Sequence, residues 1–464
     1  MKSLKLEDLK SREIDYSKIV NHTQDVSVDS ILCIDHHDRE KLDNYIELSL
    51  NQNPKYIITS SKSEVLNDRV LRFEEYQTIF DHVLHEIAPN YKKLDYFGVT
   101  GTNGKTTTAF YLNQLIGLDN LFVGTIDEEK KFSFTKEKVL TTPKLFNIVK
   151  LISLQKNNIK SVSLEVSSHA LQQNRLGNLK FLISGFTNLS QDHLDYHGSL
   201  KNYLHAKSKL FQKGISEKFV YIDSASSKEI VELSNIDSYS IGTKESNDVR
   251  LINFNDEKIK FNIDGIQVEC GLNLTGPKYI ENFLLAFSMA YYSNQYNLED
   301  LITSSENITN PPGRFESIAL ENKTVVVDYA HTPLAIKEVI KYANSKYNNV
   351  TVVLGAGGDR DKSKRVKMGE ATTNANHVII TNDNPRSEDP IEISKNILEG
   401  IPLNKNTDVI LDRKEAIYKG VESLKDNEVL LILGKGHEKV QEVQNEFLPF
   451  DDFKIAKEAL ELRS

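Results

Sequence analysis

Residues 98–108 read GVTGTNGKTTT, and this stretch decides the fold around it. The run DYFGV (95–99) that leads into it predicts a strand, and TTTAFYLNQLI (106–116) predicts a helix that leaves it. A glycine-rich loop between a strand and a helix directs backbone N–H groups and the helix N-terminus toward one point, where they bind phosphate. We predict that the nucleotide-binding residues of this loop are Gly101, Thr102, Asn103, Gly104, Lys105, Thr106 and Thr107.

The glycine spacing differs from the common phosphate-loop pattern GxxxxGK[ST], which requires glycine where this chain has Val99. Lys105 can still reach the β and γ phosphates of a nucleotide, and the Thr106 hydroxyl can ligate Mg²⁺. The alternative interpretation is a glycine turn that binds nothing, but the flanking strand and helix favour a phosphate site. The loop alone does not choose between a kinase, a motor or switch protein, and a ligase.

Length and composition limit the class of protein. The chain has 464 residues, too many for one hydrophobic core, so about three domains of ~100–200 residues are expected. A net charge of −9 and a pI near 5.8 argue against a dedicated nucleic-acid binder. The two cysteines, Cys33 and Cys270, are far apart and suggest neither a disulfide framework nor a zinc site. Without a signal-like or membrane-spanning apolar stretch, we expect a cytoplasmic protein with no nucleic-acid or membrane partner.

Apolar runs alternate with helical patterns from residue 95 onward, which predicts an α/β fold with parallel sheets. Residues 237–275 alternate in the manner of strands and predict a small antiparallel patch. The run TNPPGRF (309–315) predicts a linker, and a new α/β pattern after it predicts a doubly wound domain. The expected domains are 1–92, 93–312 and 313–464.

Further motifs follow the glycine loop in a fixed order. They are TTP (141–143), LEVSSHAL (164–171), FTNLSQDHLDYHG (186–198), YLHAKSKLF (203–211), PPGRFE (311–316), DYAHTP (328–333), GAGGDRDKSKR (355–365), DNPRSEDP (383–390) and GKGHE (434–438). This series resembles the Mur ligase family, which forms amide bonds in peptidoglycan precursors with ATP. The last three motifs are most similar to members that add meso-diaminopimelate to UDP-MurNAc-L-Ala-D-Glu.

The resemblance implies three domain roles. A small, divergent N-terminal domain would bind the UDP group, a central P-loop ATPase-like domain would bind ATP, and a C-terminal Rossmann-like domain would bind the amino acid. ATP would phosphorylate the acceptor's carboxylate, and an amine would attack the acyl phosphate. Such chemistry depends on positioning and charge neutralisation, so no protein nucleophile is required.

The resemblance also implies a catalytic and metal set of Lys105, Thr106, Glu165, His193 and Lys207, with Mg²⁺ as cofactor. Glu165 ends a predicted buried strand, where α/β sheets place ligands, although an acid capping the next helix is the alternative. Lys207 stands where the family has a carbamylated lysine. Taken without the family, the lysines of HAKSKLF predict only a solvated helix face.

Further nucleotide contacts are implied at Asn282, Arg314, Asp328 and His331. Tyr279 stands where the family has another asparagine, so the adenine site departs from the usual pattern.

For the amino acid, the resemblance implies contacts from Arg360, Asp383, Asn384, Pro385, Arg386, Gly434 and Glu438. As a bare tetrapeptide, DNPR (383–386) predicts only a surface turn. Within the resemblance, the Arg386 guanidinium can grip a carboxylate that diaminopimelate carries at its far end and L-lysine does not. Addition of L-lysine by the same kind of ligase and a folylpolyglutamate-type ligase are the alternatives, and both fit DNPR and the other motifs less well.

The nucleotide-sugar acceptor is expected against Thr141, Thr142, Ser167, Gln173 and Arg175. Lys144 stands where the family usually has an acid, and residues 1–90 lack the family's usual Asp-Ser-Arg and Gly-Asp-Gly-His stretches. We therefore expect a shortened, divergent uridine-binding domain.

Two functions of other classes compete with the ligase. A non-catalytic nucleotide-binding scaffold would not need to retain every member of the catalytic set. A P-loop kinase or switch protein would leave the C-terminal domain unexplained. We expect an enzyme that acts as a monomer on small-molecule substrates.

Overall fold

The computed structural model describes residues 3–126, 131–138, 140–155, 158–255 and 257–462. They fold as two compact units: the first lies within residues 1–96, 119–162 and 173–180, and the second within 97–118, 163–172 and 181–464. The described residues form three larger sheets and one two-stranded hairpin. The predicted α/β class, with a small N-terminal sheet, a central sheet and a C-terminal sheet, is confirmed.

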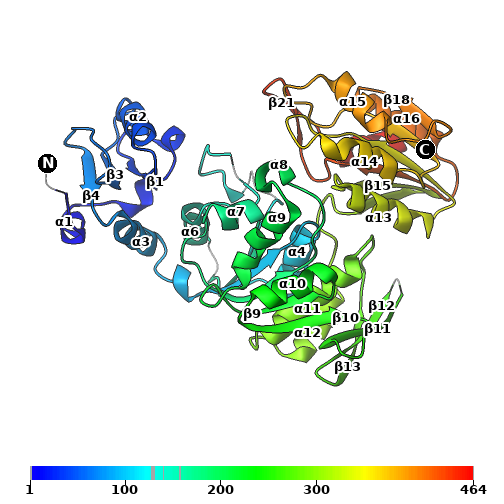
Figure 1. The fold of residues 1–464 in the computed structure, drawn as a ribbon, viewed down its shortest axis with the longest axis horizontal. Helices are drawn as coiled ribbons and strands as arrows, with labels where there is room; N and C mark the ends of the chain where they lie inside the picture. The colour runs from blue at the N-terminus through cyan, green and yellow to red at the C-terminus, as the bar shows by residue number, and fades with distance from the viewer. Residues whose placement is uncertain (1–2, 127–130, 139, 156–157, 256, 463–464) are drawn as a thin grey trace. The chain divides into compact units, whose positions relative to one another are not determined.

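In the first unit, four short parallel strands pair in the order β1-β2-β3-β4 (blue in Figure 1). Leu42 and Ile46 of the crossover helix pack on Leu32 and Ile57 of the strands, and this small cluster forms the core. The elements are α1 (Leu6–Lys10), β1 (Ile19–Val20), β2 (Ile31–Cys33), α2 (Arg39–Leu50), β3 (Tyr56–Ser60), β4 (Val70–Phe73), α3 (Tyr76–Ile87) and α6 (Leu145–Ser153).

The central sheet has the strand order β13-β12-β11-β10-β9-β8-β5-β7-β6 among the described residues. Its strands are β5 (Asp95–Thr100), β6 (Asn120–Val123), β7 (Ser161–Glu165), β8 (Phe181–Phe186), β9 (Ser216–Ile222), β10 (Asp237–Gly242), β11 (Val249–Phe254), β12 (Lys258–Ile263) and β13 (Ile266–Gly271). Its helices are α4 (Lys105–Ile116), α7 (Ser168–Gln172), α8 (Leu194–His197), α9 (Leu200–Ser208), α10 (Ala225–Leu233), α11 (Tyr279–Tyr292) and α12 (Leu298–Ser305). The almost wholly buried α11 packs against α4, the helix that follows the phosphate loop.

The antiparallel patch predicted for residues 237–275 is only partly right. β10 pairs in parallel with both β9 and β11, and only β11-β12-β13 is antiparallel. The β12–β13 hairpin turns at Asp264 and Gly265, which have φ of 49° and 80°. Positive φ at both turn residues gives the tight hairpin turn whose twist matches that of the strands. The alternating pattern therefore located the hairpin but could not show that β10 extends the parallel sheet.

The C-terminal sheet has the order β14-β15-β19-β16-β17-β18, parallel except for β14. Its strands are β14 (Glu316–Leu320), β15 (Lys323–Asp328), β16 (Asn349–Leu354), β17 (His377–Ile380), β18 (Asn406–Val409) and β19 (Glu428–Leu433). Its helices are α13 (Pro333–Asn344), α14 (Ser363–Ala371), α15 (Pro390–Leu398), α16 (Arg413–Ser423) and α17 (Asp452–Glu461), and a hairpin is made by β20 (Val440–Val443) and β21 (Glu446–Pro449).

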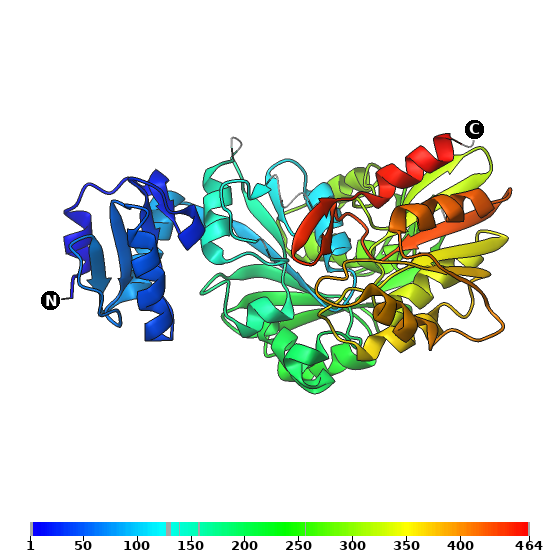
Figure 2. The same cartoon turned by 90° about the horizontal axis from the view of Figure 1, so that it is seen from above.

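Both faces of this sheet are apolar, as a doubly wound fold requires. Alternate strand residues such as Val352 and Leu431 pack under α13, α14 and α15, while Val353 and Ile432 pack under α16 and α17 (Figure 2, where α17 is the red C-terminal helix). The carboxyl ends of β15, β16 and β19 lie in register, with Leu433 paired to both Asp328 and Leu354. The loops that leave these ends therefore converge at one edge of the sheet.

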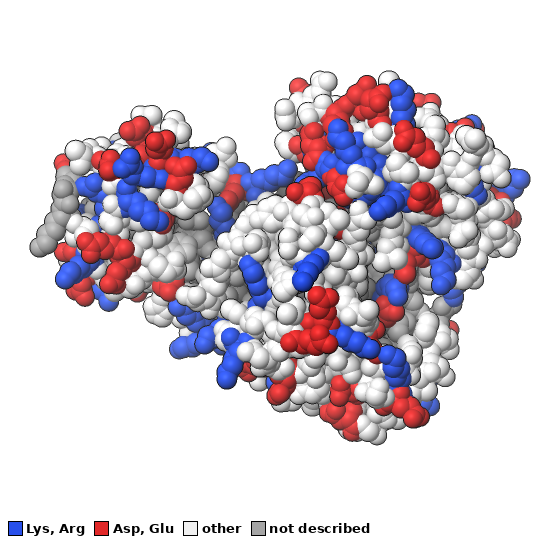
Figure 3. Space-filling model, in the orientation of Figure 1, with Lys and Arg blue, Asp and Glu red and all other residues white. Residues whose placement is uncertain are grey.

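The face of the molecule drawn in Figure 3 carries acidic and basic side chains interspersed. Within the described residues, no helix is long and apolar enough to cross a membrane.

Candidate active site

The phosphate loop runs from the end of β5 to the first residue of α4, as the sequence predicts. Gly101 and Gly104 have φ of 151° and 85°, which L side chains rarely adopt. A side chain at position 101 would also collide with Thr187, and one at position 104 would lie 2.5 Å from Asn282 Oδ1. Both glycines are thus required by backbone conformation and by close packing.

Residues after β8 hold the loop in place. Thr102 N donates to Asn188 O at 2.9 Å, and Asn103 N donates to Asn188 Oδ1 at 3.1 Å. Thr187 Oγ1 donates to Asn103 O at 2.6 Å. Thr187 and Asn188 were not among the predicted site residues, although their motif, FTNLSQDHLDYHG, was. Their role depends on which loop they meet, and a single sequence does not contain that information.

Lys105 bends back over its own loop and donates to the carbonyl oxygens of Gly101 and Thr102 at 3.1 and 2.7 Å. Burial lowers the pKa of this lysine, while Glu165 and Asp192 act in the opposite direction. Two carbonyl oxygens of the loop therefore hold the side-chain nitrogen of Lys105 in place.

Three predicted residues form one chain of hydrogen bonds. Arg314 Nη2 donates to Thr106 Oγ1, and Thr106 Oγ1 donates to Glu165 Oε2, both at 2.9 Å. The Arg314 guanidinium also lies 4.4 Å from the centre of the Tyr329 ring. Its Nε is buried and has no hydrogen-bond partner among the described residues. Buried donors are normally satisfied, so this atom indicates that a bound acceptor belongs here.

Lys207 lies on α9 and is 1% exposed. Its Nζ donates to Gly101 O at 2.6 Å and lies 4.2 Å from the centre of the Tyr203 ring. Burial and then the positive charge of Lys105 hold the pKa of Lys207 well below its ordinary value. The solvated helix face that its motif suggests in isolation is wrong for this residue, because α9 turns it inward. Burial and a neighbouring positive charge both disfavour the charged form of an amine.

His193 has a left-handed backbone (φ 53°), and its Nε2 lies 3.5 Å from Asp192 Oδ2. Burial lowers the pKa of His193 to about 4, and nearby Lys105 and Lys207 add to this against the effect of Asp192. Asp192 was not predicted as a site residue. The surrounding basic groups, His331 first, lower its pKa to about 2 although burial acts in the other direction.

His331 follows β15 and belongs to the same basic surroundings. Its Nδ1 lies 2.8 Å from Tyr329 O, a carbonyl that can only accept, so Nδ1 carries the proton. Burial, and then Lys364, lowers the pKa of His331 to about 4. Lys364 Nζ lies 3.7 Å from Asp192 Oδ1. Asp192 is thus the carboxylate that lies close to His193, His331 and Lys364.

The predicted metal ligands are Thr106, Glu165, His193 and Lys207, and only two of these carry a carboxylate or an imidazole group. Among the described residues, no three His, Cys, Asp or Glu side chains are arranged to hold a metal ion. Thr106 and Glu165 are in direct contact, and Lys207 is close enough to His193 to lower its pKa. The hydroxyl and the carboxylate are the hard oxygen donors that Mg²⁺ prefers.

The remaining predicted nucleotide contacts lie around the phosphate loop and after β15. Asn282 Oδ1 accepts from Thr108 Oγ1 at 3.4 Å. Asp328 accepts from the backbone N–H groups of Phe315 and Ala330 at 2.7 and 2.8 Å, and burial raises its pKa. Asp328 therefore holds the turn that carries Arg314, one residue before Phe315.

The predicted amino-acid residues lie in loops that follow β16, β17 and β19. Asn384 Nδ2 donates to Glu438 Oε2 at 2.8 Å, and Asn384 Oδ1 accepts from Lys435 Nζ at 3.0 Å. Lys435, which is 0% exposed, also lies 3.2 Å from Glu438 Oε2. Gly434 has φ of 114°, and a side chain there would collide with Asp383. Lys435 was not among the predicted residues, although its motif GKGHE was, because its burial against Asn384 and Glu438 depends on the tertiary structure.

Arg386 has a left-handed backbone (φ 53°) and a half-buried side chain. Its Nε donates to Glu442 Oε2 at 3.0 Å, and its Nη1 donates to Gly358 O at 2.7 Å. Pro385, before it, is buried, whereas Arg360 is exposed to solvent. The DNPR segment is therefore a fixed loop, and the bare surface turn is wrong.

Of the predicted acceptor residues, four lie in the first unit. Arg175 Nη1 donates to Thr142 O at 3.2 Å, and Arg175 Nε donates to Gln173 Oε1 at 2.8 Å. Thr142 is buried, and Thr141 is half-buried beside it. Ser167 lies in the second unit, where its Oγ accepts from Ala170 N at 3.2 Å.

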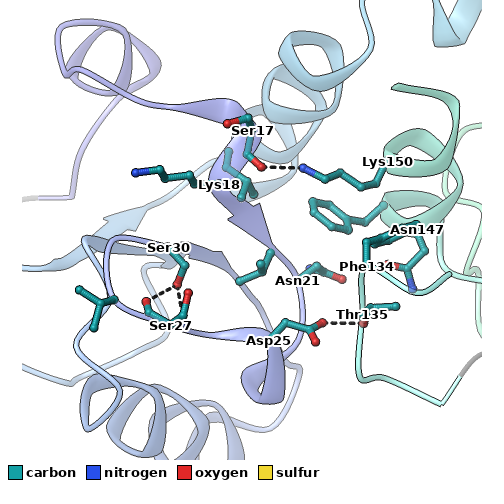
Figure 4. A pocket seen from close by; sticks show the side chains of 14 residues that line it. Ser17, Lys18, Asn21, Asp25, Ser27, Ser30, Phe134, Thr135, Asn147 and Lys150 are labelled. Atoms are coloured by element: carbon teal, nitrogen blue, oxygen red, sulfur yellow. Dashed lines mark hydrogen bonds between the residues drawn. The ribbon is translucent and has the colours of Figure 1, made fainter. Parts of the chain in front are cut away.

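The first unit also contains a cavity of about 360 Å³ (Figure 4). Lys150 of α6 donates to Ser17 O at 2.8 Å at one side of it, and Thr135 donates to Asp25 Oδ2 at 2.5 Å at the other. Its lining combines two aromatic rings with hydroxyl, amide and ammonium groups: Ser17, Lys18, Ile19, Val20, Asn21, Asp25, Ser27, Val28, Ser30, Phe134, Thr135, Phe146, Asn147 and Lys150. None of these residues was predicted.

Comparison with known proteins gives matches over most of the chain. Residues 99–290 match the Mur ligase middle domain, and residues 313–436 match the Mur ligase glutamate ligase domain. A Rickettsia conorii protein named UDP-N-acetylmuramoyl-L-alanyl-D-glutamate–2,6-diaminopimelate ligase is 33% identical over 440 residues, 90% of each chain.

Solved structures give the same result for the fold. A structure with the same ligase name has a TM-score of 0.64 and 27% identity, and the match covers 100% of this chain and 99% of the other. A MurF ligase from Thermotoga maritima in complex with ADP has a TM-score of 0.67 at 15% identity, covering 97% and 100%.

Proposed function

The chain belongs to the Mur ligase family of ATP-dependent amide ligases, and we propose that it joins meso-diaminopimelate to UDP-MurNAc-L-Ala-D-Glu in the cytoplasm. Relatives that are 33% to 35% identical carry the name of the diaminopimelate-adding ligase, which is the MurE type. The observation that carries the choice of amino acid is Arg386. It stands in a fixed loop at the carboxyl end of β17, where a doubly wound sheet binds its ligand.

The phosphate loop, Lys105 and Arg314 would hold the phosphates of ATP. Two features support this part of the proposal: the Lys105 ammonium lies at the loop, and the buried Arg314 Nε has no partner among the described residues. Both groups are positive and set before the reaction begins, so they can stabilise charge on the transferring phosphoryl group without reorganisation. The acceptor carboxylate would take this group, and the amine would then displace phosphate.

Mg²⁺ would be held by Thr106 and Glu165, with His193 as a further ligand. The 2.9 Å contact between the hydroxyl and the carboxylate supports the first two, since both offer oxygen to a hard cation. When bound, Mg²⁺ would neutralise charge on the phosphates. Lys207 would become a carbamate by reaction of its neutral amine with CO₂. Its burial and depressed pKa support this, because the neutral amine is the reactive form.

The amino acid would bind between Arg386 and Glu438. A guanidinium can hold the distal carboxylate of diaminopimelate through two parallel hydrogen bonds. The Glu438 carboxylate, fixed by Asn384 and Lys435, would suit the distal ammonium group. L-Lysine lacks that carboxylate and would leave the guanidinium without its ligand.

The cavity of the first unit would hold the uridine nucleotide of the acceptor. Phe134 and Phe146 offer faces for a planar base, while Asn147 and Lys150 offer polar contacts at the same cavity. Arg175, held by Thr142 and Gln173, would pair with an acidic group of the acceptor.

The test is amino-acid-dependent phosphate release from ATP with UDP-MurNAc-L-Ala-D-Glu, comparing meso-diaminopimelate with L-lysine. Arg386→Ala should lower kcat/KM for meso-diaminopimelate by at least about a hundredfold, because two hydrogen bonds to a charged group contribute ~1.5–3 kcal/mol each. Lys395→Ala, which changes an exposed cation in the same domain, should leave it unaltered. Near-normal kcat/KM in Arg386→Ala contradicts the proposal, and a preference for L-lysine in the unaltered protein favours the lysine-adding alternative.

A further inference from the structure

The β20–β21 hairpin holds the loop that carries Arg386. Arg386 N donates to Glu442 O at 3.0 Å, and Gln444 N donates to Arg386 O at 2.8 Å. The side chains repeat the contact, since Arg386 Nε donates to Glu442 Oε2 at 3.0 Å. One residue of the hairpin, Glu442, therefore binds both the backbone and the guanidinium of Arg386.

Glu442 is itself held in place. Its backbone N donates to Asn384 Oδ1 at 2.9 Å, and Asn384 Oδ1 also accepts from the buried Lys435 at 3.0 Å. Gln441 Nε2 donates to Asp383 O at 2.7 Å. Val443 and Glu446 pair across a two-residue turn, Gln444 and Asn445, in which both φ values are positive. Such turns fix the register of a hairpin, so the position of Glu442 is determined by the backbone.

The contacts decide which edge of the guanidinium faces a ligand. Nε is used by Glu442 and Nη1 by Gly358 O at 2.7 Å. Nη2 has no hydrogen-bond partner within the part of the chain that the structure describes. The side chains of Arg386 and Glu442 are 20% and 16% exposed, so the pair is shielded but reachable. A carboxylate must then approach the end of the guanidinium, through Nη2 and the remaining hydrogen of Nη1.

We propose that Glu442 is a positioning residue for the amino-acid substrate: it orients Arg386 so that the Nη1/Nη2 end meets the substrate's distal carboxylate. The inference rests on the proposed role of Arg386 in binding that carboxylate. Glu442 also brings a negative charge close to the place where the carboxylate binds. Two effects therefore oppose each other: a fixed guanidinium binds more tightly, and a neighbouring carboxylate repels the ligand. The structure favours the first effect, because Glu442 takes the Nε side and leaves the end of the guanidinium open.

The experiment measures KM and kcat for meso-diaminopimelate in Glu442→Ala and Glu442→Gln. Glu442→Ala removes the acceptor and frees the guanidinium, so KM should rise about tenfold, with kcat at saturation within about twofold of the unaltered protein. Glu442→Gln keeps an oxygen that can accept from Nε, so its KM should stay within about threefold or fall. KM for ATP and for the nucleotide acceptor should not change in either variant, which also shows that both are folded. Glu446→Ala, an exposed change in the same hairpin, is the matched control.

Unchanged or lower KM in Glu442→Ala overturns the inference, because Glu442 would then be inert or a competitor of the substrate. An equal rise in Glu442→Gln and Glu442→Ala also overturns it, because charge rather than orientation would be responsible. In a protein that already carries Arg386→Ala, adding Glu442→Ala should not change KM for meso-diaminopimelate any further. If Arg386→Ala leaves use of meso-diaminopimelate unaltered, the proposed function fails and the inference with it. If Arg386→Ala impairs it and Glu442→Ala does not, only the inference fails.

Discussion

The side-chain nitrogen of Lys207 lies 2.6 Å from the carbonyl oxygen of Gly101, so helix α9 is tied directly to the phosphate loop. The contact joins residues 106 positions apart and buries an amine beside a second lysine, Lys105. Burial and this like charge both disfavour the ammonium form. The pKa of Lys207 is therefore held well below its ordinary value.

We expect Lys207→Arg to lower kcat by at least about a hundredfold, since a guanidinium cannot become a carbamate that bears negative charge at the reaction centre. In the unaltered protein, ¹³C-bicarbonate should give a carbamate signal in the NMR spectrum, and Lys207→Arg should lack it. Lys209→Arg, which changes a nearby lysine whose side chain donates to Gln172, serves as the control. Full activity in Lys207→Arg contradicts the carbamate assignment.

Removal of Mg²⁺ with EDTA should abolish phosphate release, and added Mg²⁺ should restore it. Glu165→Gln should raise the Mg²⁺ concentration for half-maximal activity by about tenfold or more, because the amide offers the cation no negative charge. The exposed Glu217→Gln on β9 should leave that concentration unchanged. If Glu165→Gln needs the same Mg²⁺ concentration for half-maximal activity as the unaltered protein, Glu165 is not a metal ligand.

Lys150→Ala should raise KM for the nucleotide acceptor by about tenfold and leave KM for ATP and for the amino acid unaltered. The reason is that Lys150 lines the cavity of the first unit, where we place the uridine nucleotide, and a hydrogen bond from a charged donor would be lost. Lys41→Ala, on the exposed side of α2, provides the comparison. If Lys150→Ala and Lys41→Ala have the same KM for the nucleotide acceptor, the uridine nucleotide does not bind in this cavity.

Asp452→Ala should lower the free energy of unfolding by ~3–5 kcal/mol, measured by urea denaturation. Asp452 pairs with Arg413 through two hydrogen bonds of 2.8 and 2.7 Å, and both side chains are 0% exposed. Arg413 would keep a buried charge without its carboxylate. Replacing both residues, as in Arg413→Met with Asp452→Leu, should recover most of the loss, and a double variant no better than Asp452→Ala would contradict this account.

The ion pair of Glu388 with Arg365 should make stability depend on pH in the acid range. The two hydrogen bonds of 2.9 and 3.1 Å from Arg365 are the main cause that lowers the pKa of Glu388 from 4.5 to about 2. Because the folded state has the lower pKa, the stabilisation is complete above pH 4.5 and declines as the pH falls from 4.5 toward 2. Glu388→Gln should therefore unfold at lower urea than the unaltered protein at pH 7, and the difference should narrow below pH 4.5. Glu399→Gln, an exposed change nearby, should show no such narrowing.

The residues that the sequence indicated and those that it missed differ in a physical way. Lys105 and Arg386 stand in motifs that can be read locally, as a helix start after a glycine loop and as a turn with an arginine. Asp192 and Glu442 carry no such local pattern. Asp192 matters because His331 and Lys364 approach it, and Glu442 because a hairpin brings it to Arg386, 56 positions away. Strand β10 shows the same limit, since its alternating residues predict a strand but not the direction of its partner.

The sequence by itself determined what depends on neighbours along the chain: the strand–loop–helix at residues 95–116, the alternation of strands and helices, and the ordered motifs of a Mur ligase. Gly101 and Gly104, for example, have positive φ angles within the loop, which glycine adopts more readily than other residues. Only the tertiary structure decided which charges meet. Thr106 bonds to Glu165 and Arg314 at separations of 59 and 208 positions, and Lys207 is turned from a helix face to the phosphate loop. Burial and ion pairing alter pKa values only when such groups come together in space, so the chemistry of the site arises from folding rather than from any one motif.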